Sequence, residues 1–280
     1  MRLKVINTGN FKLDGGAMFG VLPKVIWNKL NPADQNNLCN WAMRCLLIED
    51  GNRLLLVDTG IGNKQSEKFF SYYYLNGDDS LRKSLNKCGI DFNDITDVIL
   101  THLHFDHCGG AVNYNIEKNI FYPAFSKAKY WIHQNHWKHA QNSNAREKAS
   151  FLNENFLPIE QNGQLEFLTD DMNITENISF FTVDGHTEKM ICPIINKGNK
   201  KLVYMADLIP SAAHIPINRV MAYDIRPLET MAEKEKFLSK AAEDNYILFF
   251  EHDILTECAT IQKTEKGFKE TAVGKLSDFI

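Results

Sequence analysis

Residues 98–110 read VILTHLHFDHCGG. Within this stretch, three imidazoles and one carboxylate fall inside six positions, at His102, His104, Asp106 and His107. Burying four ionisable side chains so close together is costly unless they bind something. A divalent metal ion satisfies such a cluster, and imidazole together with carboxylate suits zinc, with iron and manganese as alternatives. The stretch therefore predicts a metal site.

The residues on either side of the cluster place it on a loop at the end of a strand. Residues 98–100 form a short, apolar, β-branched run that is typical of a buried strand. Gly109 and Gly110 allow the backbone to turn tightly directly after the cluster. We therefore expect a rigid scaffold to present these side chains at a strand end.

Three more apolar runs end at or just before residues of ligand type. The predicted strands cover residues 178–183, 201–206 and 246–250. The ligand-type residues that follow or end them are His186, Asp207 and His252. With the cluster they make seven candidate ligands, a number that suits two metal ions about 3.5–4 Å apart.

The order of these motifs resembles that of the metallo-β-lactamase superfamily. A His-x-His-x-Asp-His motif is followed by Gly-His-Thr at 185–187, by a lone Asp207 and by a late His252. Leu-Val-Asp-Thr-Gly at 56–60 is similar to the family's earlier signature. The resemblance runs from about residue 40 to residue 253.

This resemblance implies a fold and a role for each ligand. The expected fold is α/β, an αβ/βα four-layer sandwich with two sheets face to face, as a single domain over residues 1–280. The first metal ion would be held by His102, His104 and His186. The second would be held by Asp106, His107 and His252. Asp207 would bridge the two ions, and Asp58 is similar to the family's carboxylate that orients a ligand.

The expected chemistry is hydrolysis by activated water. Two metal ions stabilise a bridging hydroxide near neutral pH, and one ion polarises the oxygen under attack. Asp106 and Asp207 are the candidate catalytic residues, since either can move the proton. The non-enzymatic alternative is a metal-dependent sensor or binding protein. Degenerate binding relatives would be expected to lose ligands, whereas this chain keeps all seven.

Comparing individual positions with the patterns of the superfamily's branches indicates which substrate class to expect. His104 stands where flavodiiron relatives usually carry Glu, and Asp207 with His107 differs from the pattern of the bacterial β-lactamases proper. Residues 14–20, DGGAMFG, resemble the N-terminal segment of quorum-quenching acyl-homoserine lactonases and related parathion hydrolases. We therefore expect a lactone or related ester as substrate, with phosphotriesters and glyoxalase II-type thioesters as alternatives. Pro210 stands where lactonases carry a Tyr that contacts the substrate carbonyl.

Two aromatic-rich segments, residues 18–27 and 69–74, are candidate walls of a substrate pocket. The candidate lining residues are Met18, Phe19, Phe69 and Phe70. His214 and Tyr223 are candidates for contacting the carbonyl in place of the missing Tyr. The alternative is that both segments pack onto the sheets or form the contact of a homodimer.

Composition sets the remaining expectations. The chain has 280 residues, 44% of them hydrophobic, which is enough to bury a sizeable core. Its net charge of −4 gives no sign of the basic surface that binds nucleic acid. No apolar run is long enough for a membrane span. The first residues lack the apolar stretch of a signal peptide, and the six cysteines form no CxxC pair. We expect a cytoplasmic protein that acts on a small molecule, with no nucleic-acid or membrane partner.

Helices are predicted over residues 80–88, 144–155 and 228–244, and a hairpin within residues 254–280. Asp79 is the expected N-cap of the first helix. The charge run at 233–236 in the third helix is interpreted as a solvated face.

A second histidine group consists of His133, His136 and His139. Their three-residue spacing could place two of them on one helical face, but no carboxylate joins them at ligand spacing. We therefore do not expect this group to bind a metal.

Overall fold

The computed structural model describes residues 1–280 and divides them into two compact units. Unit 1 contains residues 1–10 and 43–172, and unit 2 contains residues 11–42 and 173–280. Strands β1 (Arg2–Asp14) and β2 (Leu38–Asp50) each contain residues of both units. The single domain expected over residues 1–280 stays a prediction. None of the helices combines the length and apolar content that a membrane span needs.

Unit 1 is built on a mixed six-stranded sheet with the strand order β1-β2-β3-β4-β7-β8. Pairing is antiparallel between β2 and β3 and parallel from β3 through β8. The later strands are β3 (Arg53–Val57), β4 (Asp97–Ile99), β7 (Lys129–His133) and β8 (Leu165–Leu168). A separate hairpin is formed by β5 (Val112–Asn115) and β6 (Ile120–Pro123). Strand β4 is buried between parallel neighbours, which suits the apolar residues Val98 and Ile99, while Asp97 at its start pairs with Arg53.

The helices of unit 1 are short. They are α3 (Glu67–Ser71), α4 (Leu81–Lys87), α5 (Phe105–Cys108), α6 (Gln134–Gln141) and α7 (Leu157–Gln161). Single 3-10 turns are η1 (Phe92–Asp94), η2 (Gly109–Ala111) and η3 (Asn153–Asn155). The predicted helix over 80–88 is confirmed as α4, but its N-cap is Ser80, whose Oγ accepts from the N–H of Lys83.

The predicted helix over residues 144–155 is wrong. Residues 144–150 form turns, and only the 3-10 turn η3 follows within the predicted range. The side-chain oxygen of Asn144 accepts from the N–H groups of Arg146 and Glu147. These bonds cap a single turn, which the N–H of Lys148 closes on the backbone oxygen of Asn144. The turn does not continue as a helix, and the backbone oxygen of Ser150 accepts from the N–H of Phe105 on the ligand loop instead.

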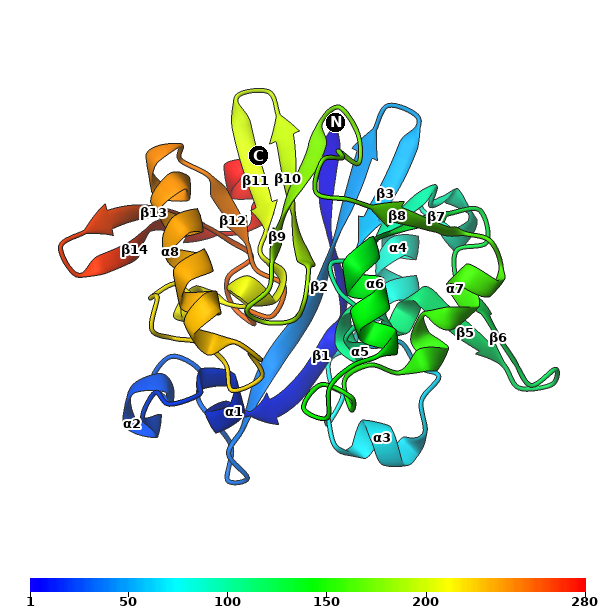
Figure 1. Cartoon of the computed structure of the whole chain (residues 1–280), viewed down its shortest axis with the longest axis horizontal. Helices are drawn as coiled ribbons and strands as arrows, with labels where there is room; N and C mark the ends of the chain where they lie inside the picture. Colours follow the sequence, from blue (N-terminus) through cyan, green and yellow to red (C-terminus); the bar gives the residue numbers. More distant parts are fainter. The chain divides into compact units, whose positions relative to one another are not determined.

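Unit 2 is built on a second six-stranded sheet, with the order β14-β13-β12-β11-β10-β9. Its strands are β9 (Ile178–Val183), β10 (Met190–Lys197), β11 (Lys200–Tyr204), β12 (Ile247–Phe249), β13 (Cys258–Thr264) and β14 (Gly267–Gly274). Only β11 and β12 pair in parallel. The three strands predicted in this region are confirmed as β9, β11 and β12, and the C-terminal hairpin as β13–β14 (Figure 1).

One long helix packs on this sheet, α8 (Pro227–Glu243), and confirms the helix predicted over 228–244 (Figure 1). The ring of Phe237 stacks on that of Phe181 in β9, with centroids 5.1 Å apart. Lys234 lies in the buried stripe of α8 and is fully buried, so the interpretation of 233–236 as a solvated face is wrong at this residue. The shorter elements of unit 2 are α1 (Gly15–Phe19), α2 (Lys24–Trp27), α9 (Leu276–Phe279), η4 (Ala206–Leu208) and η5 (Ala212–His214).

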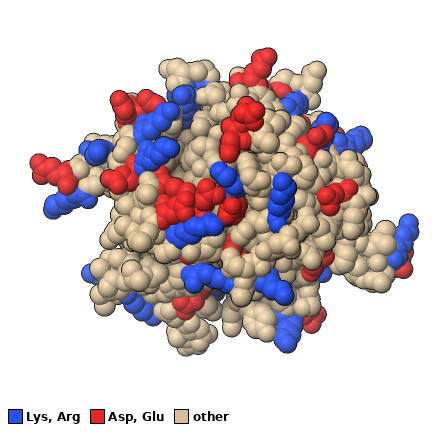
Figure 2. All heavy atoms as spheres, in the orientation of Figure 1, with Lys and Arg blue, Asp and Glu red and all other residues tan.

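Charged side chains of both signs are interspersed on the face shown in Figure 2. This mixture agrees with the small net charge of −4.

Candidate metal centre

In unit 1, the predicted ligand cluster lies directly after β4, as the sequence indicated. His102 and His104 stand on the loop, while Asp106 and His107 lie in the short helix α5. All four side chains are buried. The loop therefore gathers four ionisable groups in an environment that disfavours charge unless it is compensated.

Asp58 organises this cluster from the end of β3. Its backbone is left-handed, with φ +56°, a conformation that Asp tolerates better than most residues. Its carboxylate accepts from the N–H and Oγ1 of Thr101, at 2.8 and 2.7 Å, and lies 3.1 Å from Nδ1 of His107. Because the hydroxyl of Thr101 donates to Asp58, Thr101 Oγ1 accepts from Nδ1 of His102, 3.0 Å away. This network places the proton on Nδ1 of both histidines and leaves Nε2 for a metal.

The remaining ring nitrogens of the loop converge. Nε2 of His102 lies 3.1 Å from Nδ1 of His104. A carboxylate oxygen of Asp106 lies 3.7 Å from Nε2 of His107. These are the atoms that a metal ion would take as ligands, so the donor set of unit 1 fits zinc.

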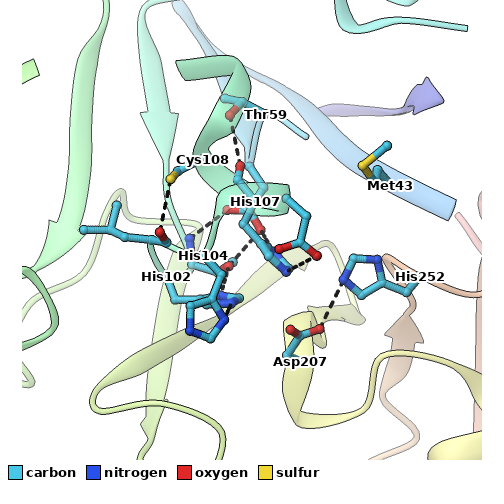
Figure 3. A network of polar contacts seen from close by, with 12 residues as sticks. Met43, Thr59, His102, His104, His107, Cys108, Asp207 and His252 are labelled. Carbon is cyan, nitrogen blue, oxygen red and sulfur yellow. Dashed lines mark hydrogen bonds and ion pairs between the residues drawn. The ribbon is translucent and has the colours of Figure 1, made fainter. Parts of the chain in front are cut away.

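Close backbone packing beneath α5 requires the two glycines of the cluster. A Cβ at Gly109 would lie 2.1 Å from the backbone oxygen of Ile61, and one at Gly110 would lie 2.3 Å from that of Thr59. The N–H and hydroxyl of Thr59 both donate to the backbone oxygen of His107, the hydroxyl at 2.9 Å (Figure 3). The Asp-Thr-Gly loop and the Gly-Gly turn therefore hold α5 in place.

In unit 2, the three other candidate ligands meet at Asp207. Nε2 of His186 lies 3.0 Å from one carboxylate oxygen, and Nε2 of His252 lies 3.2 Å from the other (the second contact is drawn in Figure 3). On the far side of each ring, Nδ1 donates to an oxygen: Asp224 for His186 at 2.9 Å, and the backbone of Ala42 for His252 at 2.7 Å. Both histidines are thus fixed with Nε2 directed at a different oxygen of one carboxylate.

The electrostatics of unit 2 favour a positive charge at this point. Burial lowers the pKa of His186, but the carboxylates of Asp207 and Asp224 outweigh it and raise the pKa to about 10. Two carboxylates around a buried imidazole draw in a cation, and a metal ion supplies that charge. Asp224 was not predicted from the sequence, because no local motif marks a residue that lies 38 positions from its partner.

The residues proposed from sequence to contact substrate are divided between the units. In unit 2, Met18 and Phe19 are buried with His214; the rings of Phe19 and His214 stack at 4.6 Å. Nε2 of His214 donates to the backbone oxygen of Met18 at 2.8 Å, and Nδ1 lies 2.7 Å from Oγ of Ser211. Both ring nitrogens of His214 are therefore engaged within unit 2. Tyr223 is exposed.

In unit 1, Phe69 and Phe70 lie half-buried in α3. The ring of Phe69 packs edge-on against Phe105, the residue before Asp106, at 5.3 Å. This contact brings α3 beside the ligand loop. The roles of all six residues toward a substrate stay predictions.

Comparisons with known proteins agree with this picture. The sequence model of the metallo-beta-lactamase superfamily matches residues 44–252. An N-acyl homoserine lactonase of Bacillus cereus is 24% identical over 242 residues, which cover 79% of this chain and 85% of that protein. A solved structure of a probable metal-dependent hydrolase from Staphylococcus aureus matches with a TM-score of 0.88 and 28% identity, over 97% of this chain and 95% of that one. The structure of AidC, a dizinc quorum-quenching lactonase, matches with a TM-score of 0.79 and 21% identity, over 98% and 95% of the two chains.

These matches confirm the predicted fold and class of enzyme. The matched segment includes Asp58 and all seven candidate ligands. The His and Asp donor sets support a metal cofactor. The chain belongs to the metallo-beta-lactamase superfamily, and it is a hydrolase of that superfamily homologous to N-acyl homoserine lactonases.

Proposed function

We propose that this hydrolase opens a lactone or cleaves a related carboxylic ester, using two zinc ions bound by the seven predicted ligands. One observation carries the proposal. The two oxygens of the Asp207 carboxylate are directed at two different histidines, His186 and His252. By resemblance, His186 belongs to the first metal ion and His252 to the second, so a carboxylate between them is disposed to bridge.

The chain's own residues would prepare this centre for hydrolysis. When bound, the zinc ions supply Lewis acidity that activates water and polarises a carbonyl. Asp58 and Asp224 accept from Nδ1 of His107 and His186, so Nε2 is the nitrogen that each ring offers to a metal ion. Asp106 and Asp207 are the buried carboxylates placed to accept a proton during attack. No Ser or Cys nucleophile is required.

The choice of a lactone is supported by the relatives and by the N-terminal segment. The B. cereus relative is an N-acyl homoserine lactonase, and AidC was solved with a product, an acyl homoserine. The lactonase-like residues 14–20 form α1, whose N-cap Asp14 accepts from the N–H of Ala17 at 2.8 Å. We propose Met18, Phe19, Phe69 and Phe70 as the residues that contact an acyl tail, and His214 or Tyr223 as the residue that contacts the substrate carbonyl.

A substrate panel tests this proposal. The zinc-loaded enzyme is assayed on acyl-homoserine lactones of increasing acyl length, aryl esters, thioesters and phosphotriesters, with Asp207→Ala as the blank. We expect lactones to be the best substrates. Their KM should fall about fourfold per added methylene until the pocket is filled, because each buried CH₂ contributes about 0.8 kcal/mol. Thioester or phosphotriester turnover orders of magnitude above every lactone would contradict the proposed substrate class.

A further inference from the structure

The second histidine group of unit 1 lies against the ligand loop. His136 of α6 is fully buried, and its Nε2 accepts a hydrogen bond of 2.9 Å from the backbone N–H of Leu103. Leu103 stands between His102 and His104 in the sequence. Because a backbone N–H can only donate, Nε2 of His136 carries no proton and is not available to a metal.

The peptide groups of the loop are bound on both sides. The backbone oxygen of Leu103 accepts from the thiol of Cys108 at 3.3 Å, so both polar groups of this residue have partners. The N–H of Phe105 donates to the backbone oxygen of Ser150 at 3.0 Å. These bonds fix the backbone on either side of His104, and hence the direction of its side chain.

The chain that follows α6 completes this support. The ring of Phe151 lies 4.8 Å from that of His104 and 5.8 Å from that of His136. Nε2 of His139 lies 2.8 Å from the buried carboxylate of Glu147, which ties residues 144–151 back to α6. The helix and the following turns therefore form one support beneath the ligand loop.

We propose that His136 is a positioning residue, which sets the backbone of the ligand loop through Leu103 and thereby sets the affinity of the loop for metal. This inference rests on the proposed metal site. Its physical basis is the buried N–H of Leu103, which without an acceptor would turn away to find another partner and would carry the two neighbouring histidines with it. Replacing a residue that orients a metal ligand typically weakens metal binding or activity by about 10–100-fold.

Two substitutions separate the acceptor from the bulk of the ring. His136→Gln places an amide oxygen near the position of Nε2 and keeps an acceptor, whereas His136→Leu keeps much of the volume and removes it. The zinc dissociation constant of each metal-free protein is measured by competition with a chromophoric chelator. We expect His136→Leu to bind zinc about tenfold more weakly or worse, and His136→Gln to stay within about threefold of wild type.

A second readout and a control exclude general destabilisation. Amide hydrogen exchange of metal-free protein should show Leu103 protected in wild type and His136→Gln, and exposed in His136→Leu. The control is Trp137→Phe, since Trp137 lies on the same helix and its ring packs edge-on against those of Phe156 and Phe167. We expect this variant to lose stability but to keep its zinc affinity.

The outcomes are distinct. Zinc binding by His136→Leu that equals wild type would overturn the inference while leaving the metal site intact. An equal loss in Trp137→Phe, or no rescue in His136→Gln, would also overturn it. Failure of the wild-type protein to bind zinc would refute the proposed metal site, and this inference with it.

Discussion

Four of the candidate ligands are histidines whose Nδ1 is held by a neighbouring oxygen atom. The acceptors are Oγ1 of Thr101 for His102, the carboxylate of Asp58 for His107, the carboxylate of Asp224 for His186 and the backbone of Ala42 for His252. Each bond selects the tautomer with a free Nε2 and fixes the ring plane. A chance group of histidines would not share this arrangement, so the pattern supports a metal site more strongly than proximity alone.

The buried ring of His214 makes a prediction about pH. Burial lowers its pKa to about 3, whereas the unfolded chain titrates near pH 6.5. Between these values only the unfolded chain binds the proton, so the stability due to the neutral ring is complete above about pH 6.5 and is lost as the pH falls toward 3. His214→Gln keeps a donor for the backbone of Met18 but cannot be protonated. We expect wild type to lose up to about 1.4 kcal/mol per pH unit relative to this variant within that window.

Urea unfolding of both metal-free proteins at several pH values between about 7.5 and 4.5 measures this difference. Acid effects common to the two proteins cancel in the comparison. Unfolding free energies that fall in parallel would show that the ring of His214 does not titrate as its environment indicates.

Residues with a dense local motif were predicted from the sequence, and residues that act through distant partners were not. The cluster at 102–107 predicts a metal site because it contains four ligand-type side chains within six positions. Asp224 and His136 were missed as supports because their partners, His186 and Leu103, are far away in the chain. The partner of His136 is a backbone N–H, which every residue except proline has, so the sequence does not reveal it.

At the scale of elements, α8 holds two loops through adjacent residues. The Glu233 carboxylate accepts from the N–H groups of Asp184 and Gly185, at 2.6 and 3.1 Å, just before His186. Nζ of Lys234 donates to three backbone oxygens, those of His214, Pro216 and Arg219. The second loop leads to Asp224, the partner of His186. One turn of helix thus fixes both members of the His186–Asp224 pair.

Lys234→Met tests this role of α8. The substitution keeps the apolar stem but leaves three buried carbonyl groups without their donor. We expect the free energy of unfolding to fall by about 2–5 kcal/mol, because each unsatisfied buried group is costly. The control Lys236→Met changes an exposed residue of the same helix and should stay within about 0.5 kcal/mol of wild type. Urea denaturation measures both, and equal effects would refute the role.

The elements themselves were predictable where one physical signal dominated. Strands β4, β9, β11 and β12 are apolar runs, and all four were predicted. The helix predicted over 144–155 is only one capped turn, because the backbone oxygen of Ser150 accepts from the distant N–H of Phe105 and not from the next helical turn. Lys234 was predicted to be solvated because it is charged, but it lies in the buried stripe of α8 with Thr230 and Phe237. In both cases a bond to a distant segment, which the local pattern does not show, decided the outcome.

At the scale of the whole molecule, four of the candidate ligands belong to unit 1 and three to unit 2. The superfamily was predictable from the order of the motifs along the chain, and the sequence model of the superfamily matches residues 44–252, which contain them. The residues that contact substrate stay predictions, since no motif in the sequence identifies them. Pro210 stands where the resemblance to lactonases would place a Tyr.

The most direct test of the account is the zinc content of the reconstituted protein, measured by elemental analysis for wild type, Asp207→Ala and His133→Asn. We expect about two zinc ions per chain for wild type and for His133→Asn. This variant keeps a side-chain acceptor for the N–H of Asn135. Asp207→Ala should retain about one ion or fewer, with loss of activity, because its carboxylate contacts a histidine of each predicted set. A wild-type content near zero, or equal losses in the two variants, would contradict the dinuclear centre.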